Sequence, residues 1–240
     1  MKQPLIIITG ASSGFGEATA RLFSKDGYPL LLLARRLERV KSLGLPNTMC
    51  KQVDVNDLEA FAAAVREAES KYGPTDCIVN NAGVMLLGGM DQQDPNEWHS
   101  MLNTNVMGVM HGIHTVLEGM IQRRRGTIIN VSSVAGRKTF PNHAAYCATK
   151  FAVHALSENL REELASKDIR VSVIAPGAAE TELLSHTTSK EIIAGYESWK
   201  EDMGGVMSAQ DVARSIKFVY DQPQSVCIRE VVLASTRQEP

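Results

Sequence analysis

Short apolar runs alternate with longer, more polar segments along most of the 240-residue chain. The runs are rich in leucine and β-branched residues, which is typical of parallel strands buried on both faces. They predict strands at Leu5–Thr9, Leu30–Ala34, Thr48–Val53, Cys77–Val79, Gly126–Val131, Arg170–Ile174 and Ser225–Leu233. Because segments of helical character lie between the strands, we expect an α/β fold. Its core would be a doubly wound parallel sheet of about seven strands with helices on both faces.

The same pattern bears on domain organisation. No internal repeat, low-complexity segment or linker interrupts it, so we expect one domain over residues 1–240. The polar stretch from Glu180 to Gly205 carries few core positions. Long insertions in compact domains are often lids or binding loops, so we expect a substrate loop at about residues 180–205. A second reading, one or two surface helices, is compatible with the first.

A glycine-rich turn follows the first predicted strand at once: Gly10-Ala11-Ser12-Ser13-Gly14-Phe15-Gly16. The next segment is helical in character and ends at Gly27. A strand, a glycine-rich turn and a helix form the first half of a dinucleotide-binding βαβ unit, as in a Rossmann fold. Gly10 allows the tight turn, Gly14 lets the backbone approach a pyrophosphate, and Gly16 permits close helix packing. The helix N-terminus offers free N–H groups to the phosphates.

Candidate acid–base chemistry lies in the second half of the chain. Tyr146 and Lys150 are four residues apart, so on a helix they share one face. A nearby cation stabilises a phenolate and lowers the tyrosine pKa from its ordinary value of about 10. Tyr146 is therefore a candidate proton donor or acceptor. Ser133, at the end of an apolar run, is a candidate to hold a substrate oxygen.

The motifs described above and several others follow one another along most of the chain. In order, they are Thr9 to Gly16, Asn80-Asn81-Ala82-Gly83, Asn105, Ser133, Tyr146, Lys150 and Pro176-Gly177. Together they resemble the short-chain dehydrogenases/reductases, in the branch of about 250 residues with TGxxxGxG and YxxxK motifs. The resemblance implies a single-domain Rossmann fold. It also implies a catalytic set, in which Asn105 completes a proton relay through water to the lysine. That set is Asn105, Ser133, Tyr146 and Lys150.

The serine assignment requires a choice between two neighbours. Ser132 and Ser133 point to opposite faces if the strand alternation continues, so only one faces the cofactor. The spacing to Tyr146 matches the family for Ser133. We therefore expect Ser132 to pack or to cap.

Further cofactor contacts are implied by the resemblance. Asp54 and Val55 would flank the adenine ring, and Thr181 would bind the nicotinamide amide. Asn80 is either a site residue or a side chain that ties loops to the sheet. The full cofactor-binding set is Gly10, Ser12, Ser13, Gly14, Phe15, Gly16, Arg35, Arg36, Asp54, Val55, Asn81, Ala82, Gly83, Tyr146, Lys150, Pro176, Gly177 and Thr181.

The end of the second strand bears on the choice of cofactor. NAD-specific folds carry an acidic residue near this point, which binds the ribose hydroxyls. Here the chain reads Ala34-Arg35-Arg36, and an arginine pairs with the 2′-phosphate of NADP. We therefore expect NADP (NADPH) in preference to NAD, and favour Arg35 over Arg36 as the phosphate ligand. The alternative is that Arg36 begins the next helix and pairs with Glu38 or with solvent.

The motifs predict an NADP-dependent oxidoreductase that transfers a hydride between NADPH and a carbonyl or alcohol substrate. The resemblance implies a small aldehyde, a ketone or a 3-oxo/3-hydroxy acid, and a homodimer or homotetramer. The alternative is a non-catalytic NADPH-binding sensor or regulatory protein on the same fold. An epimerase or dehydratase of the longer relatives is disfavoured, because 240 residues leave no room for their added substrate domain.

Net charge and the lengths of the apolar runs argue against nucleic-acid-binding, secreted and membrane-spanning proteins. A net charge of −2 gives no electrostatic argument for nucleic acid or for an acidic membrane surface. The basic run Arg123-Arg124-Arg125 is expected to be a solvated helix end. The first apolar run is too short for a signal peptide, and no stretch is long enough to span a bilayer.

The spacing of the cysteines and histidines bears on disulfides and on metal binding. The four cysteines are scattered without C-x-x-C spacing, which favours reduced thiols and a cytoplasmic location. His111 and His114 lie three apart on an expected helix, but no acidic or cysteine partner has matching spacing. No metal site is expected.

Overall fold

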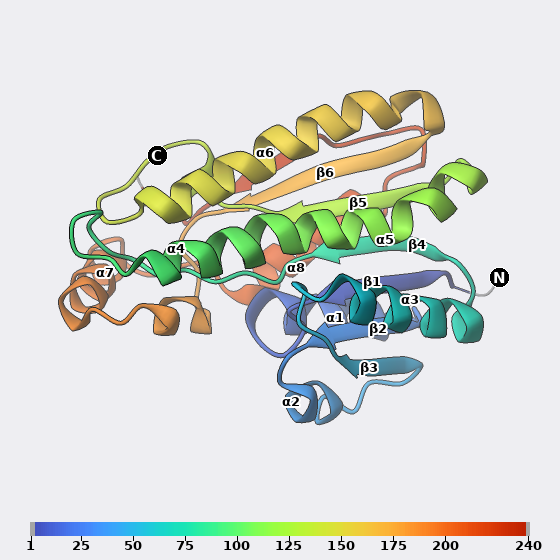
Figure 1. Ribbon diagram of the computed structural model, residues 1–240, viewed down its shortest axis with the longest axis horizontal. Coiled ribbons are helices and arrows are strands. Elements are labelled where there is room, and N and C mark those ends of the chain that lie inside the picture. The colour runs from blue at the N-terminus through green and yellow to red at the C-terminus, as the bar shows by residue number, and fades with distance from the viewer. Residues whose placement is uncertain (1–2, 239–240) are drawn as a thin grey trace.

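The computed structural model describes residues 3–238, which form a seven-stranded parallel sheet (Figure 1). The strand order is β3-β2-β1-β4-β5-β6-β7. The strands are β1 (Leu5–Thr9), β2 (Leu30–Ala34), β3 (Thr48–Gln52), β4 (Thr75–Asn80), β5 (Gly126–Val131), β6 (Ile169–Pro176) and β7 (Glu230–Leu233). The predicted doubly wound parallel sheet is confirmed.

Helices cover both faces of the sheet. They are α1 (Gly14–Lys25), α2 (Leu37–Lys41), α3 (Leu58–Tyr72), α4 (Pro95–Leu102), α5 (Gly108–Arg123), α6 (Ala144–Leu164), α7 (Lys190–Asp202) and α8 (Ala209–Tyr220). In Figure 1, α3, α5 and α6 lie in front of the sheet, and α1 and α8 lie behind it. A π-helical turn, Asn103–Met107, joins α4 to α5.

The strands supply two separate apolar cores because successive side chains point to opposite faces. Leu5 and Ile7 of β1 belong to the core beneath α3, α5 and α6. Ile6 and Ile8 belong to the core beneath α1 and α8. All four side chains are fully buried. The uninterrupted apolar run at the start of the chain is thus explained by burial on both sides.

The strand order fixes where a ligand can enter. β1 pairs with β2 on one side and with β4 on the other, so the direction of winding reverses between β1 and β4. Ligands of open parallel sheets bind at this reversal, outside the carboxyl ends of the strands. The glycine-rich turn after β1 and Asn81 after β4 both lie there.

Two sequence-based expectations need correction. The last strand is shorter than predicted, because only Glu230–Leu233 pairs with β6, and most of residues 224–229 are exposed. The basic run is not a merely solvated helix end: Arg123 donates to the Thr75 carbonyl, Arg124 pairs with Asp168 and Arg125 pairs with Asp76. These contacts fasten the end of α5 to β4 and to the turn before β6.

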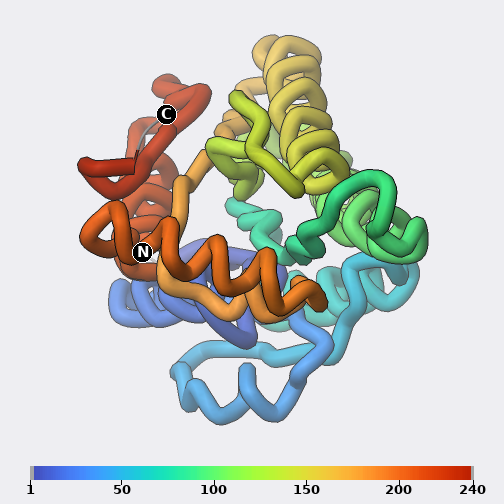
Figure 2. The backbone as a smooth tube through the Cα atoms, turned by 90° about the vertical axis from the view of Figure 1, so that its left-hand side faces the viewer, coloured from blue at the N-terminus to red at the C-terminus, as the bar shows by residue number. Residues whose placement is uncertain are grey.

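The polar stretch at residues 180–205 forms a 3₁₀ turn, Glu182–His186, followed by α7. No residue of α7 is buried, so the surface-helix reading of this stretch is correct. Figure 2 looks at the end of the molecule where the strands have their carboxyl ends, and shows this orange segment crossing it. Within the described residues, no helix has the length and apolar character needed to cross a membrane.

Candidate active site

A cavity of about 1030 Å³ opens at the carboxyl ends of the strands. It brings together most of the residues that the sequence singles out. Those that line it are Gly10, Ser12, Ser13, Gly14, Phe15, Arg35, Arg36, Asp54, Val55, Asn81, Ala82, Gly83, Ser133, Tyr146, Lys150, Pro176, Gly177 and Thr181. Gly16 and Asn105 do not line it; Gly16 packs against Gly10, and Asn105 lies against Gly83.

The glycine-rich turn forms a close-fitting cradle at one end of the cavity. Gly10 and Gly14 have φ of 64° and 53°, a backbone region that other residues adopt only under strain. A Cβ on Gly16 would meet the carbonyl oxygen of Gly10 and lie 2.7 Å from Asn81 Nδ2. Ser13 precedes α1, and its side chain does not cap that helix. The first N–H groups of α1 are therefore left for a phosphate, so the turn fits a dinucleotide.

Thr9 ties the glycine-rich turn to the end of β4. Its Oγ1 accepts hydrogen bonds from the backbone N–H groups of Asn81 and Ala82, at 2.9 and 3.0 Å. Asn81 Nδ2 donates back to the Thr9 carbonyl at 2.9 Å. Asn80 lies deeper and donates from Nδ2 to Asn130 Oδ1 at 2.8 Å. Asn80 therefore joins β4 to β5 within the sheet and does not line the cavity.

The two adjacent serines point in different directions. Ser133 precedes the 3₁₀ turn Val134–Gly136, caps it, and hydrogen-bonds the phenol of Tyr146. Ser132 is buried; its Oγ donates to the Lys150 carbonyl at 3.1 Å and lies 2.9 Å from His154 Nδ1. The structure therefore brings Ser133, and not Ser132, to the tyrosine.

Tyr146 and Lys150 lie one turn apart on α6, and both are buried. Lys150 Nζ donates to the Val131 carbonyl at 3.1 Å and lies 5.6 Å from the centre of the Tyr146 ring. Burial lowers the pKa of Lys150 to about 8. Burial also raises the pKa of Tyr146, and the hydrogen bond from Ser133 opposes this only in part. The predicted lowering of the Tyr146 pKa by Lys150 is thus wrong for the protein alone, because burial of the phenol is the largest influence on its pKa.

Asn105 lies in the π-helical turn and is buried. Its Oδ1 accepts from the Val84 N–H at 2.8 Å, and its Nδ2 donates to the Val84 carbonyl at 2.9 Å. The same Nδ2 donates to Thr149 Oγ1 at 3.1 Å. The side chain thus fixes the segment after Gly83 against α6. The proton relay through Asn105 stays a prediction.

Asp54 and Val55 form the wall beside the predicted adenine site. Asp54 Oδ1 accepts from the Asn56 N–H at 3.0 Å, which closes the turn after β3. The Val55 carbonyl lies 2.8 Å from His111 Nδ1 on α5. His111 is therefore a tie between this wall and α5. Among residues 3–238, no group of three His, Cys, Asp or Glu side chains could hold a metal ion.

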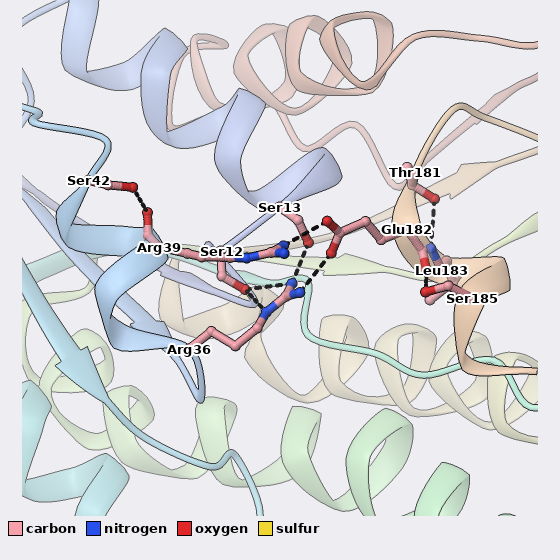
Figure 3. A network of polar contacts seen from close by, with 9 residues as sticks. All are labelled: Ser12, Ser13, Arg36, Arg39, Ser42, Thr181, Glu182, Leu183 and Ser185. Atoms are coloured by element: carbon pink, nitrogen blue, oxygen red, sulfur yellow. Dashed lines mark hydrogen bonds and ion pairs between the residues drawn. The ribbon is translucent and has the colours of Figure 1, made fainter.

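The guanidinium of Arg36 lies over the glycine-rich turn (Figure 3), and Arg35 also lines the cavity. Its Nε and Nη2 donate to Ser12 Oγ at 3.2 and 3.0 Å, and Nη2 donates to Ser13 Oγ at 2.9 Å. Nη1 donates to Glu182 Oε2 at 2.8 Å. Arg36 precedes α2, and its acidic partner is Glu182 and not Glu38.

At the other end of the cavity, the sequence predicts a substrate loop at about residues 180–205 but does not single out the individual side chains that line this end. The His143 ring lies 6.2 Å from both the Tyr146 and the Tyr196 rings, centre to centre. Gln238 folds back and accepts from the Ala178 N–H at 2.8 Å. The missed lining residues include Phe140, His143, Leu184, Tyr196, Trp199 and Gln238. One signal for them was present, namely two aromatic residues within the polar stretch 180–205.

Comparison with known proteins gives consistent matches. A family model described as short chain dehydrogenase matches residues 4–192. An uncharacterized oxidoreductase of Staphylococcus saprophyticus is 34% identical over 244 residues, covering 99% of this chain and 98% of that protein. A sulfoacetaldehyde reductase of Chromohalobacter salexigens is 34% identical, covering 98% of this chain and 95% of that protein. A serine dehydrogenase solved in a closed form with NADP+ has a TM-score of 0.91 at 28% identity, covering 98% of this chain and 96% of that one.

Proposed function

The chain belongs to the short chain dehydrogenase family and is an oxidoreductase of that family. From this premise, we propose that it transfers a hydride between NADPH and a small aldehyde, ketone or 3-oxo/3-hydroxy acid, with Tyr146 as general acid and base. One observation carries the proposal: Ser133, Tyr146 and Lys150 line the cavity together, beside a glycine-rich turn that fits a dinucleotide.

The proposed cofactor site extends along the carboxyl ends of β1 to β4. The turn from Gly10 to Gly16 would hold the pyrophosphate, and Asp54 and Val55 would flank the adenine. The preference for NADP rests on Arg36, which Ser12 and Ser13 hold over the turn, and on the lack of a carboxylate at Ala34. The serine dehydrogenase that shares this fold was solved with NADP+.

The proposed chemistry divides between cofactor and protein. Reduced nicotinamide, when bound, supplies the hydride for the carbonyl carbon. Tyr146 donates its phenolic proton to the oxygen that becomes the hydroxyl, and Ser133 hydrogen-bonds the same oxygen. Lys150, held by the Val131 carbonyl, stabilises the tyrosinate that forms. In the oxidative direction, the same groups return the proton.

The substrate end of the cavity is lined by aromatic side chains. His143 and Tyr196 lie beside Tyr146, and Tyr196 packs edge-on against Trp199 at 5.3 Å. The sulfoacetaldehyde reductase and the serine dehydrogenase are both named for small molecules, which supports the proposed substrate class.

Three further assignments belong to the same proposal. Residues 1–240 act as one domain, with residues 180–205 as the substrate loop. Asn105 completes the proton relay through water to Lys150. The protein is a homodimer or homotetramer, and the large apolar side chains exposed on the α4–α6 side support this. They are Leu102, Met107, Met110 and Phe151.

The experiment that tests the proposed function is an oxidation assay. NADPH and NADH are each offered with a panel of small aldehydes, ketones and 3-oxo acids, and the loss of reduced nicotinamide is followed. We expect turnover with NADPH on at least one member, at a higher kcat/KM than with NADH. Tight NADPH binding without turnover on any member would favour the non-catalytic binding protein instead.

A further inference from the structure

An ion cluster at the mouth of the cavity joins Arg36 to two residues, Arg39 and Glu182, that have no role in the function proposed above. Glu182 accepts from Arg36 Nη1 through Oε2 at 2.8 Å and from Arg39 Nη1 through Oε1 at 2.7 Å (Figure 3). Glu182 lies 146 and 143 residues along the chain from these arginines. We call these three residues the arginine–glutamate bridge. It joins the start of α2 to the start of the 180–205 segment.

The bridge uses the guanidinium that lies over the glycine-rich turn. Arg36 directs Nε and Nη2 to Ser12 and Ser13, and its remaining Nη1 to Glu182. A ribose 2′-phosphate bound at this place would need the same N–H groups, because arginine binds phosphate through paired donors. A carboxylate and a phosphate a few ångströms apart repel each other strongly in a partly exposed site. The Glu182 carboxylate and a 2′-phosphate therefore compete.

We propose that Glu182 sets the selectivity between NADPH and NADH, as an internal anion that competes with the 2′-phosphate for Arg36 and Arg39. This inference rests on the proposed function, since it concerns the cofactor of that site. NADH carries a 2′-hydroxyl in place of the phosphate, and a hydroxyl can donate to a carboxylate. Glu182 thus weakens the binding of NADPH and leaves that of NADH unharmed. It moderates the NADP preference that Arg36 supplies.

The arginine–glutamate bridge lies where a 2′-phosphate could replace the Glu182 carboxylate as the partner of the arginines. The side chains of Arg36, Arg39 and Glu182 are 46%, 53% and 46% exposed, so the bridge can open without disturbing a core. The hydrogen bonds from Arg36 and Arg39 hold the pKa of Glu182 at about 2. The carboxylate is therefore ionised at every ordinary assay pH. It acts as a fixed charge rather than as a pH switch.

Glu182→Gln tests the proposal, because it removes the charge and keeps the size of the side chain. Glu180→Gln is the matched control: Glu180 lies two residues earlier and pairs with Lys200 at 3.6 Å, away from the arginines. Dissociation constants are measured by calorimetry for NADPH, NADH, 2′,5′-ADP and 5′-AMP. Thermal unfolding of each variant shows whether it is folded.

In Glu182→Gln, we expect the ratio of the NADH to the NADPH dissociation constant to rise about tenfold, as expected for one unit charge removed beside a phosphate. The ratio of the 5′-AMP to the 2′,5′-ADP dissociation constant should rise by the same factor. Glu180→Gln should change neither of the two ratios. Unchanged or lower ratios in a folded Glu182→Gln protein would overturn the inference and leave the proposed function standing. If the wild type binds none of the four nucleotides, the inference and the proposed function both fail.

Discussion

The carboxamide of Asn105 satisfies both backbone polar groups of Val84, through hydrogen bonds of 2.8 and 2.9 Å. Val84 follows the Asn81–Gly83 segment at the cavity wall, and Asn105 lies in the π-helical turn between α4 and α5. A Cβ on Gly83 would lie 3.3 Å from Asn105 Oδ1 and 3.9 Å from Lys150 Nζ. The pair therefore sets the distance between the wall of the cavity and helix α6, which carries Tyr146 and Lys150.

Asn105→Ala should destabilise the protein by about 2–4 kcal/mol, because it leaves the N–H and the carbonyl of Val84 buried without partners. Urea unfolding measures the change. Asn103→Ala is the control, since Asn103 lies in the same turn and is exposed. Its effect should stay within about 0.5 kcal/mol. Equal effects of the two substitutions would contradict a clamping role for Asn105.

Lys150→Met should abolish turnover and yet stabilise the protein. Burial lowers the pKa of Lys150 from 10.5 to about 8, so at pH 7 the folded protein holds a charge that it disfavours. Methionine keeps the apolar stem but loses the hydrogen bond to Val131, so we expect a net gain of about 1–3 kcal/mol at pH 7. Thermal unfolding of the two proteins checks this. A less stable Lys150→Met variant would show that the hydrogen bond outweighs the burial of the charge.

The gain from Lys150→Met should also depend on pH. Between pH 8 and 10.5, the unfolded chain holds more protons on Lys150 than the folded one, so Lys150 makes wild-type stability rise with pH in this window. Below pH 8, Lys150 is protonated in both the folded and the unfolded chain, and the full free-energy cost of burying its charge is present. The difference between variant and wild type should therefore be largest near pH 7 and shrink toward pH 10. A difference that is constant over this range would exclude the lowered pKa.

The two adjacent serines should differ in their effect on catalysis. Ser133→Ala removes the hydroxyl that contacts Tyr146 and should lower kcat by about a hundredfold or more. Ser132→Ala removes contacts with Lys150 and His154 only, so we expect a loss of about 1 kcal/mol in stability and kcat within about tenfold of wild type. The reverse order of the two kcat values would show that the serine roles are exchanged.

Gly16→Ala should abolish nucleotide binding, because the new methyl group would meet Gly10 and Asn81 within the cradle. Calorimetry with NADPH measures the loss. Gly195→Ala is the matched control: its methyl group meets nothing within 4 Å on α7, and should stabilise the protein by about 0.5–1 kcal/mol. NADPH binding by Gly16→Ala with wild-type affinity would mean that the turn is not the cradle.

Apolar runs and short motifs in the sequence were enough to predict the fold and much of the cavity lining. The strand from Leu5 to Thr9 and the strand from Leu30 to Ala34 were predicted with the observed bounds, since burial on both faces leaves an uninterrupted apolar run. The last strand was overestimated, because Val226 and Ile228 look like strand residues but precede the stretch that pairs with β6. Which residues pair with a neighbouring strand is not encoded in hydropathy alone.

Contacts between distant segments could not be read from the chain. Glu182 reaches Arg36 across 146 residues, and Gln238 returns to Ala178 from the end of the described chain. The pKa of Tyr146 was misjudged for a related reason. Its spacing from Lys150 was visible, but the burial that dominates both groups depends on the whole tertiary structure.

The most direct test of the account is Tyr146→Phe, assayed for NADPH-dependent reduction and, separately, for NADPH binding. Tyr28→Phe is the control, because Tyr28 packs with Phe23 and Tyr220 on the other side of the sheet. We predict that Tyr146→Phe binds NADPH within about threefold of wild type but loses at least a thousandfold in kcat. Tyr28→Phe should keep its activity. Turnover by Tyr146→Phe at the wild-type rate would contradict the assignment of Tyr146 as the general acid and base.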